Sequence, residues 1–265
     1  GGFAARRPVF AGSCKDRCPW GVLGDIVHAA MAPYGYDVQV CYTCGGGPRE
    51  TRIVAGAQRP EPLPPGTEGP VSPLPAGPVD FGVTTTNFLW WAYQGTNSFA
   101  HDGPRHNLRL IAVIQSPVYL IVALRRQPGV RSLADLKKLG RPLRILWDGQ
   151  MLPNGPSADV LAYYGLGPSA GRADVMLNGL RPAERAGFDL AIYAGDRSNA
   201  PEYNVWYEVS QRADLVYIAL PDELLTSLAR KFDMRRVRLP AAYLRGVDQP
   251  IPTVAWIGNA IYGRS

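Results

Sequence analysis

The sequence has no apolar run long enough to cross a membrane and none of the common catalytic motifs. The apolar run Val118–Leu124 is far shorter than the roughly 18 residues that a transmembrane helix needs. The three histidines, His28, His101 and His106, show neither a recognisable triad arrangement nor H-E-x-x-H spacing. G-x-S-x-G, P-loop and G-x-G-x-x-G patterns are missing as well. We therefore expect a protein that is not an enzyme and needs no cofactor.

An initiator methionine and a basic-then-apolar leader are also missing, because the sequence opens at Gly1-Gly2. If the protein is exported, its signal peptide has already been removed from this sequence. A length of 265 residues with 46% hydrophobic and 19% charged residues is typical of a globular protein of one large or two small domains. We expect a soluble, exported, periplasmic protein.

The net charge of +6 does not by itself indicate nucleic-acid binding. Basic residues are scattered or lie in turns such as Arg6-Arg7 and Arg125-Arg126, and no helix carries a basic stripe interleaved with aromatic residues. An ordinary basic surface is the simplest interpretation, and attraction of an anionic ligand or an acidic partner is an alternative. We expect no nucleic-acid partner.

Four cysteines form two closely spaced pairs, Cys14/Cys18 and Cys41/Cys44. An even number of cysteines at short spacing is typical of disulfide bridges in an exported protein, and three connectivities are open. A four-thiolate metal or iron–sulfur site is an alternative, because both pairs follow segments that resemble neighbouring parallel strands. A thioredoxin-like redox pair is a third interpretation.

Strand and helix patterns alternate along the chain, which predicts an α/β protein. Apolar strand patterns occur at 108–114 and, after Ser116-Pro117, at 118–124. Ser132 can cap a short helix that precedes a strand at 143–147, and Asn87 is a natural N-cap for a helix that ends at Gly95. Residues 58–78 hold eight prolines and are expected to form a surface excursion.

The chain divides best near Ser116 and again near Asp214. This predicts a discontinuous first lobe of residues 1–115 and 215–265 and an inserted second lobe of residues 116–214. Two α/β lobes joined by two linkers define a hinge and a central cleft.

Several motifs resemble the TAXI-type solute receptors of tripartite ATP-independent periplasmic (TRAP) transporters, within the type II periplasmic-binding-protein superfamily. The motifs are Val79–Thr84 before a helix that ends at Gly95, Gly129–Lys137, Gly187–Ala191 and Leu220-Pro221. The loop Gly149–Ser157 is longer and less regular than the corresponding family loop, and the cysteine pairs and the proline-rich insert are not family hallmarks. The resemblance implies a two-lobed fold with two mixed sheets flanked by helices, and a receptor that delivers its ligand to a membrane transporter.

In an open α/β lobe, ligands bind beyond the carboxyl ends of the strands. Three threonine hydroxyls at a helix N-terminus can hold a carboxylate or another polar head group. Two adjacent tryptophans on a helix point about 100° apart, so we expect one in the core and one offered to a ligand. The predicted ligand-contacting residues are Ser13, Trp20, Thr84, Thr85, Thr86, Asn87, Trp90, Trp91, Ser116, Tyr119, Gln150, Asn154, Ser157, Asp196, Asn199 and Tyr203.

The sequence therefore predicts a monomeric periplasmic solute-binding protein that closes on a small organic ligand by hinge motion and serves a membrane transporter. The ligand is either a carboxylated small molecule or an apolar or amphipathic lipid- or sterol-like molecule. The same fold is compatible with a signalling input domain. The alternative from a different class is a cysteine-based redox or metal-binding periplasmic protein.

Overall fold

The computed structural model describes residues 6–12, 19–44, 47–60, 75, 77–149, 152–168, 170–175, 187–195 and 211–265. The described chain falls into two compact units. Unit 1 comprises the described residues up to Ser116 and again from Gly258 to Ser265, and unit 2 comprises those between Pro117 and Ile257. The chain first passes from unit 1 to unit 2 between Ser116 and Pro117, and residues 215–257 belong to unit 2.

The elements of unit 1 alternate between strand and helix, as the sequence pattern predicts. In chain order they are β1 (Val9–Ala11), α1 (Pro19–Met31), η1 (Ala32–Tyr34), β2 (Gln39–Cys41), α2 (Gly47–Val54), β3 (Phe81–Thr85), α3 (Thr86–Gln94) and η2 (Asn97–Phe99). The first part of β4 (Leu108–Arg125) and the last part of β10 (Ile251–Arg264) complete the unit.

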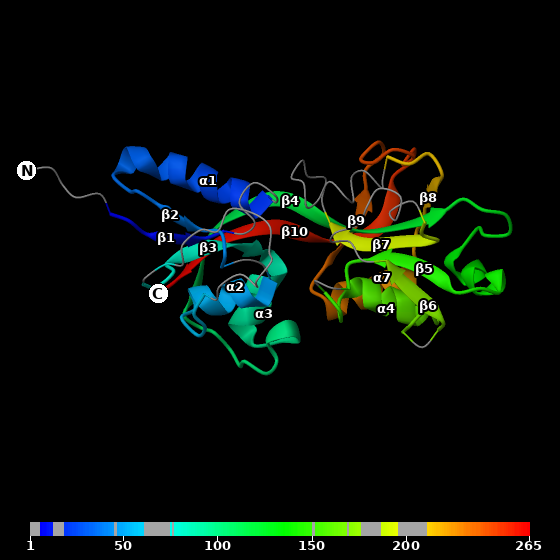
Figure 1. The fold of residues 1–265 in the computed structure, drawn as a ribbon, viewed down its shortest axis with the longest axis horizontal. Helices are drawn as coiled ribbons and strands as arrows, with labels where there is room; N and C mark the ends of the chain where they lie inside the picture. The colour runs from blue at the N-terminus through cyan, green and yellow to red at the C-terminus, as the bar shows by residue number, and fades with distance from the viewer. Residues whose placement is uncertain are drawn as a thin grey trace, which may run out of the picture. The chain divides into compact units, whose positions relative to one another are not determined.

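In the sheet of unit 1, β1 pairs in parallel with β2 and β3. β10 pairs antiparallel with β3 on the far side, and β4 lies next to β10. Helix α1 covers one face of this sheet, and α2 and α3 cover the other (Figure 1). Because both faces are covered, the strand residues Phe10, Val83 and Tyr262 are fully buried.

Unit 2 is built on a second group of strands and helices. Its elements are the rest of β4, then η3 (Leu133–Leu139), β5 (Leu143–Trp147), α4 (Pro156–Tyr163), β6 (Arg172–Val175), β7 (Leu190–Gly195), β8 (Leu215–Tyr217), α7 (Asp222–Lys231), β9 (Arg235–Leu239) and the first part of β10. β5 pairs in parallel with β6 and β7, and β7 pairs antiparallel with β4. β8 pairs with β4 and β9 pairs with β10, which explains why residues 215–257 fold with this unit.

The mixed α/β class is confirmed, but two predicted strands are one. β4 runs without interruption from Leu108 to Arg125, through Pro117, where the sequence predicts a break. β4 and β10 each contribute to both units, so the hydrogen-bonded strands form one ten-stranded sheet instead of two separate sheets.

The predicted cap at Ser132 is confirmed and fixes the start of η3. The Ser132 side chain bonds the backbone N–H of Asp135, and the Asp135 carboxylate accepts from the N–H of Ser132 in return. This reciprocal capping box satisfies donors that the first turn would otherwise leave unpaired. Backbone donors and Lys138 hold the pKa of Asp135 at about 2.

Among the described helices, none combines the length and the apolar character that a membrane span requires.

Candidate ligand site

The carboxyl ends of β1, β2 and β3 lie at one edge of the sheet of unit 1, because the three strands are parallel. The backbone N–H of Gly12 donates to the carbonyl oxygen of Cys41 at 3.1 Å and so ties the ends of β1 and β2 together. This is the edge at which open α/β sheets bind ligands. The start of α3 follows β3 directly at this edge.

The start of α3 holds buried polar groups without a described partner. Thr84 is fully buried and Asn87 is 3% exposed. Among the residues that the structure describes, the hydroxyls of Thr84 and Thr85 and both amide atoms of Asn87 form no hydrogen bond. A buried polar group left unpaired costs about 1–3 kcal/mol. Such a set at a helix N-terminus indicates a place where a bound polar group supplies the missing hydrogen bonds.

Asn87 is not the N-cap that the sequence predicts. The helix begins two residues earlier than expected, at Thr86, with Thr85 in an extended conformation at the N-cap and no side-chain capping bond. The reason is that Thr85 still pairs with Asn259 in the β3–β10 ladder, so strand passes into helix without an intervening loop. Asn87 therefore lies in the first turn and points into the interior. The predicted C-cap, Gly95, is confirmed by its positive φ of 71°.

Trp20, in the first turn of α1, is hydrogen-bonded to strand β10 of the sheet. Its indole Nε1–H donates to Oδ1 of Asn259 at 2.9 Å, and both side chains are buried. Asn259 itself was not predicted as a site residue. The one signal in the sequence is an amide within the otherwise apolar stretch Ala255–Tyr262.

The two tryptophans of α3 diverge as their spacing predicts. Trp91 is 2% exposed and packs edge-on against Phe88, with ring centroids 5.7 Å apart. Trp90 is 46% exposed and stacks on Tyr93 at 6.2 Å, with the ring planes 9° apart. Trp90 therefore offers an aromatic face to the surface, and Trp91 belongs to the core.

An apolar hollow of about 400 Å³ lies beside the exposed face of α3. This volume is within the range of small-molecule pockets. Its lining residues are Thr86, Leu89, Trp90, Tyr93, Leu108, Arg109, Leu110 and Ala260. Thr86 is the residue shared by the hollow and the polar N-terminus of α3, so a polar and an apolar surface meet there.

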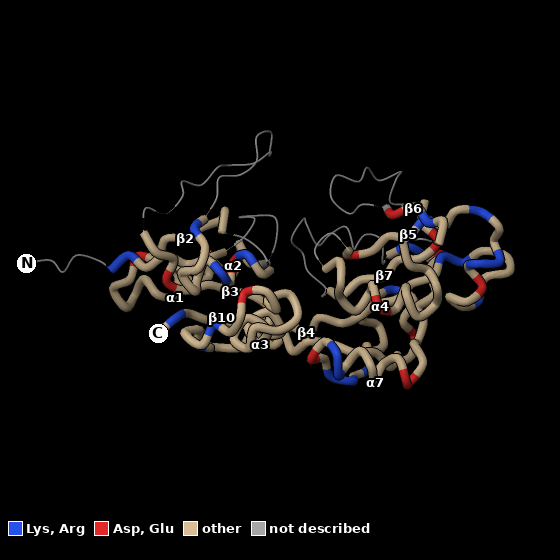
Figure 2. Tube along the Cα trace, turned by 90° about the horizontal axis from the view of Figure 1, so that it is seen from below, with Lys and Arg blue, Asp and Glu red and all other residues tan. Residues whose placement is uncertain are grey.

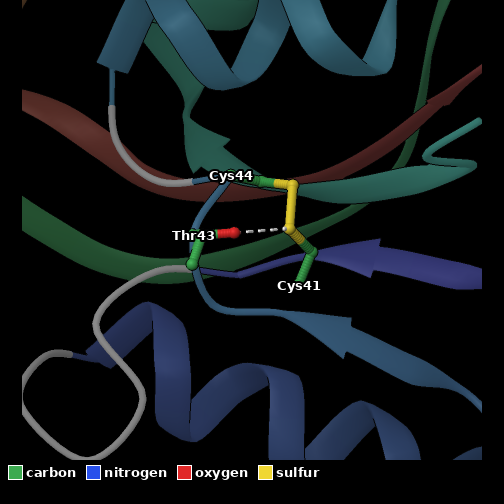
Figure 3. The surroundings of a disulfide bond; sticks show 3 residues. All are labelled: Cys41, Thr43 and Cys44. Carbon is green, nitrogen blue, oxygen red and sulfur yellow. Dashed lines mark hydrogen bonds between the residues drawn. A yellow bond between two sulfur atoms is a disulfide. The ribbon is translucent and has the colours of Figure 1, made fainter. Parts of the chain in front are cut away.

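A disulfide joins Cys41 at the end of β2 to Cys44 in the turn before α2 (Figure 3). The Cα atoms are 5.6 Å apart, and the Thr43 hydroxyl lies 3.5 Å from the Cys41 sulfur. Both cysteines are almost completely buried. The predicted bridge is thus confirmed for this pair, and these sulfurs shape the turn at the site edge. Cys14 and Cys18 lie outside the described residues.

Glu50 of α2 is a buried carboxyl close to this edge. It accepts a hydrogen bond from the Tyr262 hydroxyl at 2.9 Å, and burial raises its pKa well above the usual value. A β-carbon at Gly82 would lie 3.0 Å from the carboxyl oxygen and 2.9 Å from Ala11. Only glycine therefore lets α2 approach β3 this closely.

Unit 2 has its own buried carboxyl, Asp148, directly after β5. It is 3% exposed, and its Oδ2 accepts from the backbone N–H of Ala194 at 2.8 Å. Burial raises the pKa of Asp148 to about 6, against the opposing effect of the Ala194 N–H and of Ser157. The fully buried Ser157 hydroxyl, in the first turn of α4, is near enough to affect this pKa but forms no hydrogen bond of normal geometry. Ser157 was predicted as a site residue and Asp148 was not, although Asp148 directly follows a predicted strand.

A model of a known protein family matches residues 65–262, which is most of the chain. The chain belongs to the NMT1-like family.

Solved structures similar to this NMT1-like chain are distant in sequence. A protein from Bordetella bronchiseptica RB50 has 14% identity and a TM-score of 0.44, and the match covers 99% of this chain and 64% of that one. An R. palustris protein solved with adipate has 13% identity and a TM-score of 0.46, covering 98% and 77%. The alkanesulfonate-binding protein SsuA from Xanthomonas axonopodis pv. citri, bound to MOPS, has 11% identity and a TM-score of 0.35, covering 87% and 91%. These likenesses are too distant to carry a ligand or a partner over to this chain.

The predicted site residues of the NMT1-like chain divide between the two units. Unit 1 brings together Trp20, Thr84, Thr85, Thr86 and Asn87, with Trp90 at the neighbouring hollow and Trp91 in the core. Ser116 ends unit 1 within β4.

The remaining predicted residues belong to unit 2 or lie outside the described chain. Tyr119 is a core residue of unit 2, with its ring edge-on to Tyr243 at 5.1 Å. Asn154 is exposed in the turn before α4. Ser13, Gln150, Asp196, Asn199 and Tyr203 lie outside the described residues.

Proposed function

We propose that this NMT1-like protein binds a small organic ligand at the N-terminus of α3 and delivers it to a membrane transporter, as a periplasmic receptor of the TAXI type. The observation that carries this proposal is the set of buried polar groups of Thr84, Thr85 and Asn87 that form no hydrogen bond to any described residue and lie beside an apolar hollow. If neither a ligand nor water supplied these hydrogen bonds, the buried groups would lower the stability of the folded protein without any compensating interaction. A binding role, not a catalytic one, is part of the proposal.

The ligand that fits these surfaces is a carboxylated molecule with an apolar body. The free N–H groups and positive dipole end of α3 favour an anionic head group, and the threonine and asparagine side chains add hydrogen-bond donors. Trp90, Tyr93, Leu108 and Leu110 offer a wall for the apolar part. Arg109 also lines the hollow, with its Nη1 committed to the carbonyl oxygens of His106 and Leu108. This proposal unites the two ligand classes that the sequence leaves open.

We assign Cys41 and Cys44 a structural role at this site. Cys41 and Cys44 are bonded to each other and buried, so neither presents a reactive thiolate to solvent.

The proposal predicts that aromatic or aliphatic carboxylates stabilise the protein against heat. At 100 times its dissociation constant a ligand adds about 2.7 kcal/mol, which raises Tm by about 5–10 °C for a protein of this size. Differential scanning fluorimetry with a graded series of carboxylates and the matching alcohols measures this shift. We expect Asn87→Ala to abolish the shift without loss of stability in the ligand-free protein, because the variant removes an amide that has no described partner.

Gln94→Ala is the matched control, because Gln94 is an exposed polar residue on the same helix. It is expected to keep the full ligand-induced shift. Equal shifts in Asn87→Ala and Gln94→Ala, or no stabilisation by any carboxylate, would contradict the proposed site.

A further inference from the structure

The whole net charge of the protein falls within one short segment of unit 2. Residues 125–144 contain seven basic residues and one acid, a net charge of +6. The full chain has 28 basic and 22 acidic residues, so the remainder has 21 of each and is neutral. The excess positive charge is therefore concentrated and not scattered. We call the exposed basic residues of this segment the basic end of unit 2.

The fold gathers this segment around one buried acid. The carboxylate of Asp189, 2% exposed, accepts from Arg125 at 3.2 Å, from Arg141 at 2.6 Å and from the backbone N–H of Arg144 at 2.9 Å. The end of β4, the loop between η3 and β5 and the start of β5 are thereby held together. Figure 2 shows blue segments gathered at this end of unit 2, beside β5.

Four cations of the basic end have no acidic partner among the described residues. Arg125 and Arg141 are paired with Asp189, and Lys138 is paired with Asp135. The other four side chains are exposed and form no ion pair there: Arg126, Arg131, Lys137 and Arg144. At physiological salt the Debye length is about 8 Å, so charges that lie far apart are screened from one another. Charges that lie close together, as in this segment, add up to one electrostatic field that attracts a partner.

The chemistry of the basic end favours an anionic lipid surface over a protein or a nucleic acid. Segment 125–144 is described throughout, and it contains no large hydrophobic side chain that is exposed. Protein interfaces are anchored by buried aromatic or aliphatic residues, and single-stranded nucleic acids are held by stacking on aromatic rings. Adsorption to charged headgroups needs neither, since it is driven by several cations near a negative surface.

We propose that the basic end of unit 2 adsorbs the protein to the surface of an anionic membrane. Binding of this kind is reversible, and it weakens as salt increases. It holds the protein close to a membrane without a membrane-spanning or apolar anchor. The inference is independent of the ligand site in unit 1.

The test is co-sedimentation with vesicles of equal parts phosphatidylglycerol and phosphatidylcholine, compared with vesicles of phosphatidylcholine alone. We expect binding to the anionic vesicles at ~0.05 M salt and its loss at ~0.5 M. The quadruple variant Arg126→Gln, Arg131→Gln, Lys137→Gln and Arg144→Gln is expected to reduce the partition coefficient by about 100-fold or more.

A second quadruple variant controls for net charge. Arg6, Arg59, Arg235 and Arg238 are exposed residues without a described ion pair, and changing these four to Gln also lowers the net charge from +6 by four, to +2. We expect this variant to keep most of the vesicle binding. Equal losses in the two variants, or wild-type protein that does not sediment with anionic vesicles, would overturn the proposal. Far-UV circular dichroism verifies that both variants are folded.

Discussion

Asp189→Asn is expected to destabilise unit 2 by about 1–3 kcal/mol. The substitution removes a buried carboxylate and leaves several of its donors with a poorer acceptor, while the two arginine side chains stay partly solvated. Here one carboxylate is shared by the guanidinium groups of Arg125 and Arg141, the amide of Gln127 and the backbone N–H of Arg144. An asparagine amide has one acceptor oxygen in place of two. Its NH₂ group would face the N–H donors that now bond the second carboxylate oxygen, and it cannot accept hydrogen bonds from them.

The pH dependence of this effect follows from the pKa of Asp189. Burial raises that pKa, but hydrogen bonds from Arg141, Arg144 and Gln127 outweigh burial and hold it below the usual range. The carboxylate therefore stabilises the folded protein fully above the unfolded pKa of about 3.9, and this contribution is lost as the pH falls below that value. The difference between wild type and Asp189→Asn should be largest at neutral pH.

Amide hydrogen exchange shows in which part of the protein the Asp189→Asn variant has lost stability. Because the chain has two units, a single unfolding curve does not isolate one of them, and exchange rates in β4, β5 and β7 report on unit 2 directly. Asp174→Asn is the control, since Asp174 pairs with Arg172 but is 41% exposed, and such a pair contributes about 0–1 kcal/mol. Exchange rates in Asp189→Asn equal to those in Asp174→Asn would show that Asp189 does not hold the unit together.

Asp148→Asn is expected to stabilise the protein at neutral pH. The folded-state pKa of Asp148 is about 6, above its unfolded value. Such a group favours folding most when protonated, at low pH, and the relative stability is lost as the pH rises through about 6. The asparagine variant keeps the acceptor for the Ala194 N–H and never has to be charged. The gain is on the order of 3 kcal/mol at pH values well above 6, and it vanishes below about pH 4.

Amide hydrogen exchange in β5 and β7 of wild type and Asp148→Asn, corrected for the intrinsic exchange rate at each pH between about pH 4 and pH 8, measures this difference. Other groups that titrate, including Glu50 with its raised pKa, are common to both proteins and cancel in the comparison. We expect the two stability curves to meet at the acidic end and to separate as the pH rises. Parallel curves over the whole range would mean that Asp148 is not a buried, protonatable carboxyl.

The sequence predicts the local features of this protein better than those that depend on distant residues. The cap at Ser132, the bridge of Cys41 and Cys44 and the different directions of Trp90 and Trp91 follow from spacing over a few positions. These features are confirmed because the interacting residues are neighbours in the chain.

Features that depend on packing were predicted less well. The sequence pattern predicts a break at Pro117, yet β4 continues through it, because the strand lies next to β10 and pairs with β7 from Tyr119 onward. The local sequence predicts Asn87 as a helix cap. The pairing of Thr85 with Asn259, which is far away in the sequence, instead places the start of the helix at Thr86. The burial of Glu50 and Asp148 could not be predicted from the neighbouring sequence. The residues next to an acid do not show whether a distant element of the fold covers it.

The proposed binding of a small organic ligand at the N-terminus of α3 can be tested by native mass spectrometry of the protein, purified without added ligands and compared with the Asn87→Ala variant. We expect the wild-type protein to have a mass above that of its polypeptide. The extra mass should be released on denaturation as a small carboxylated molecule with an apolar body, and it should be missing from the variant. A released molecule of the same mass and amount in both proteins, or a bound species that resists denaturation, would contradict it.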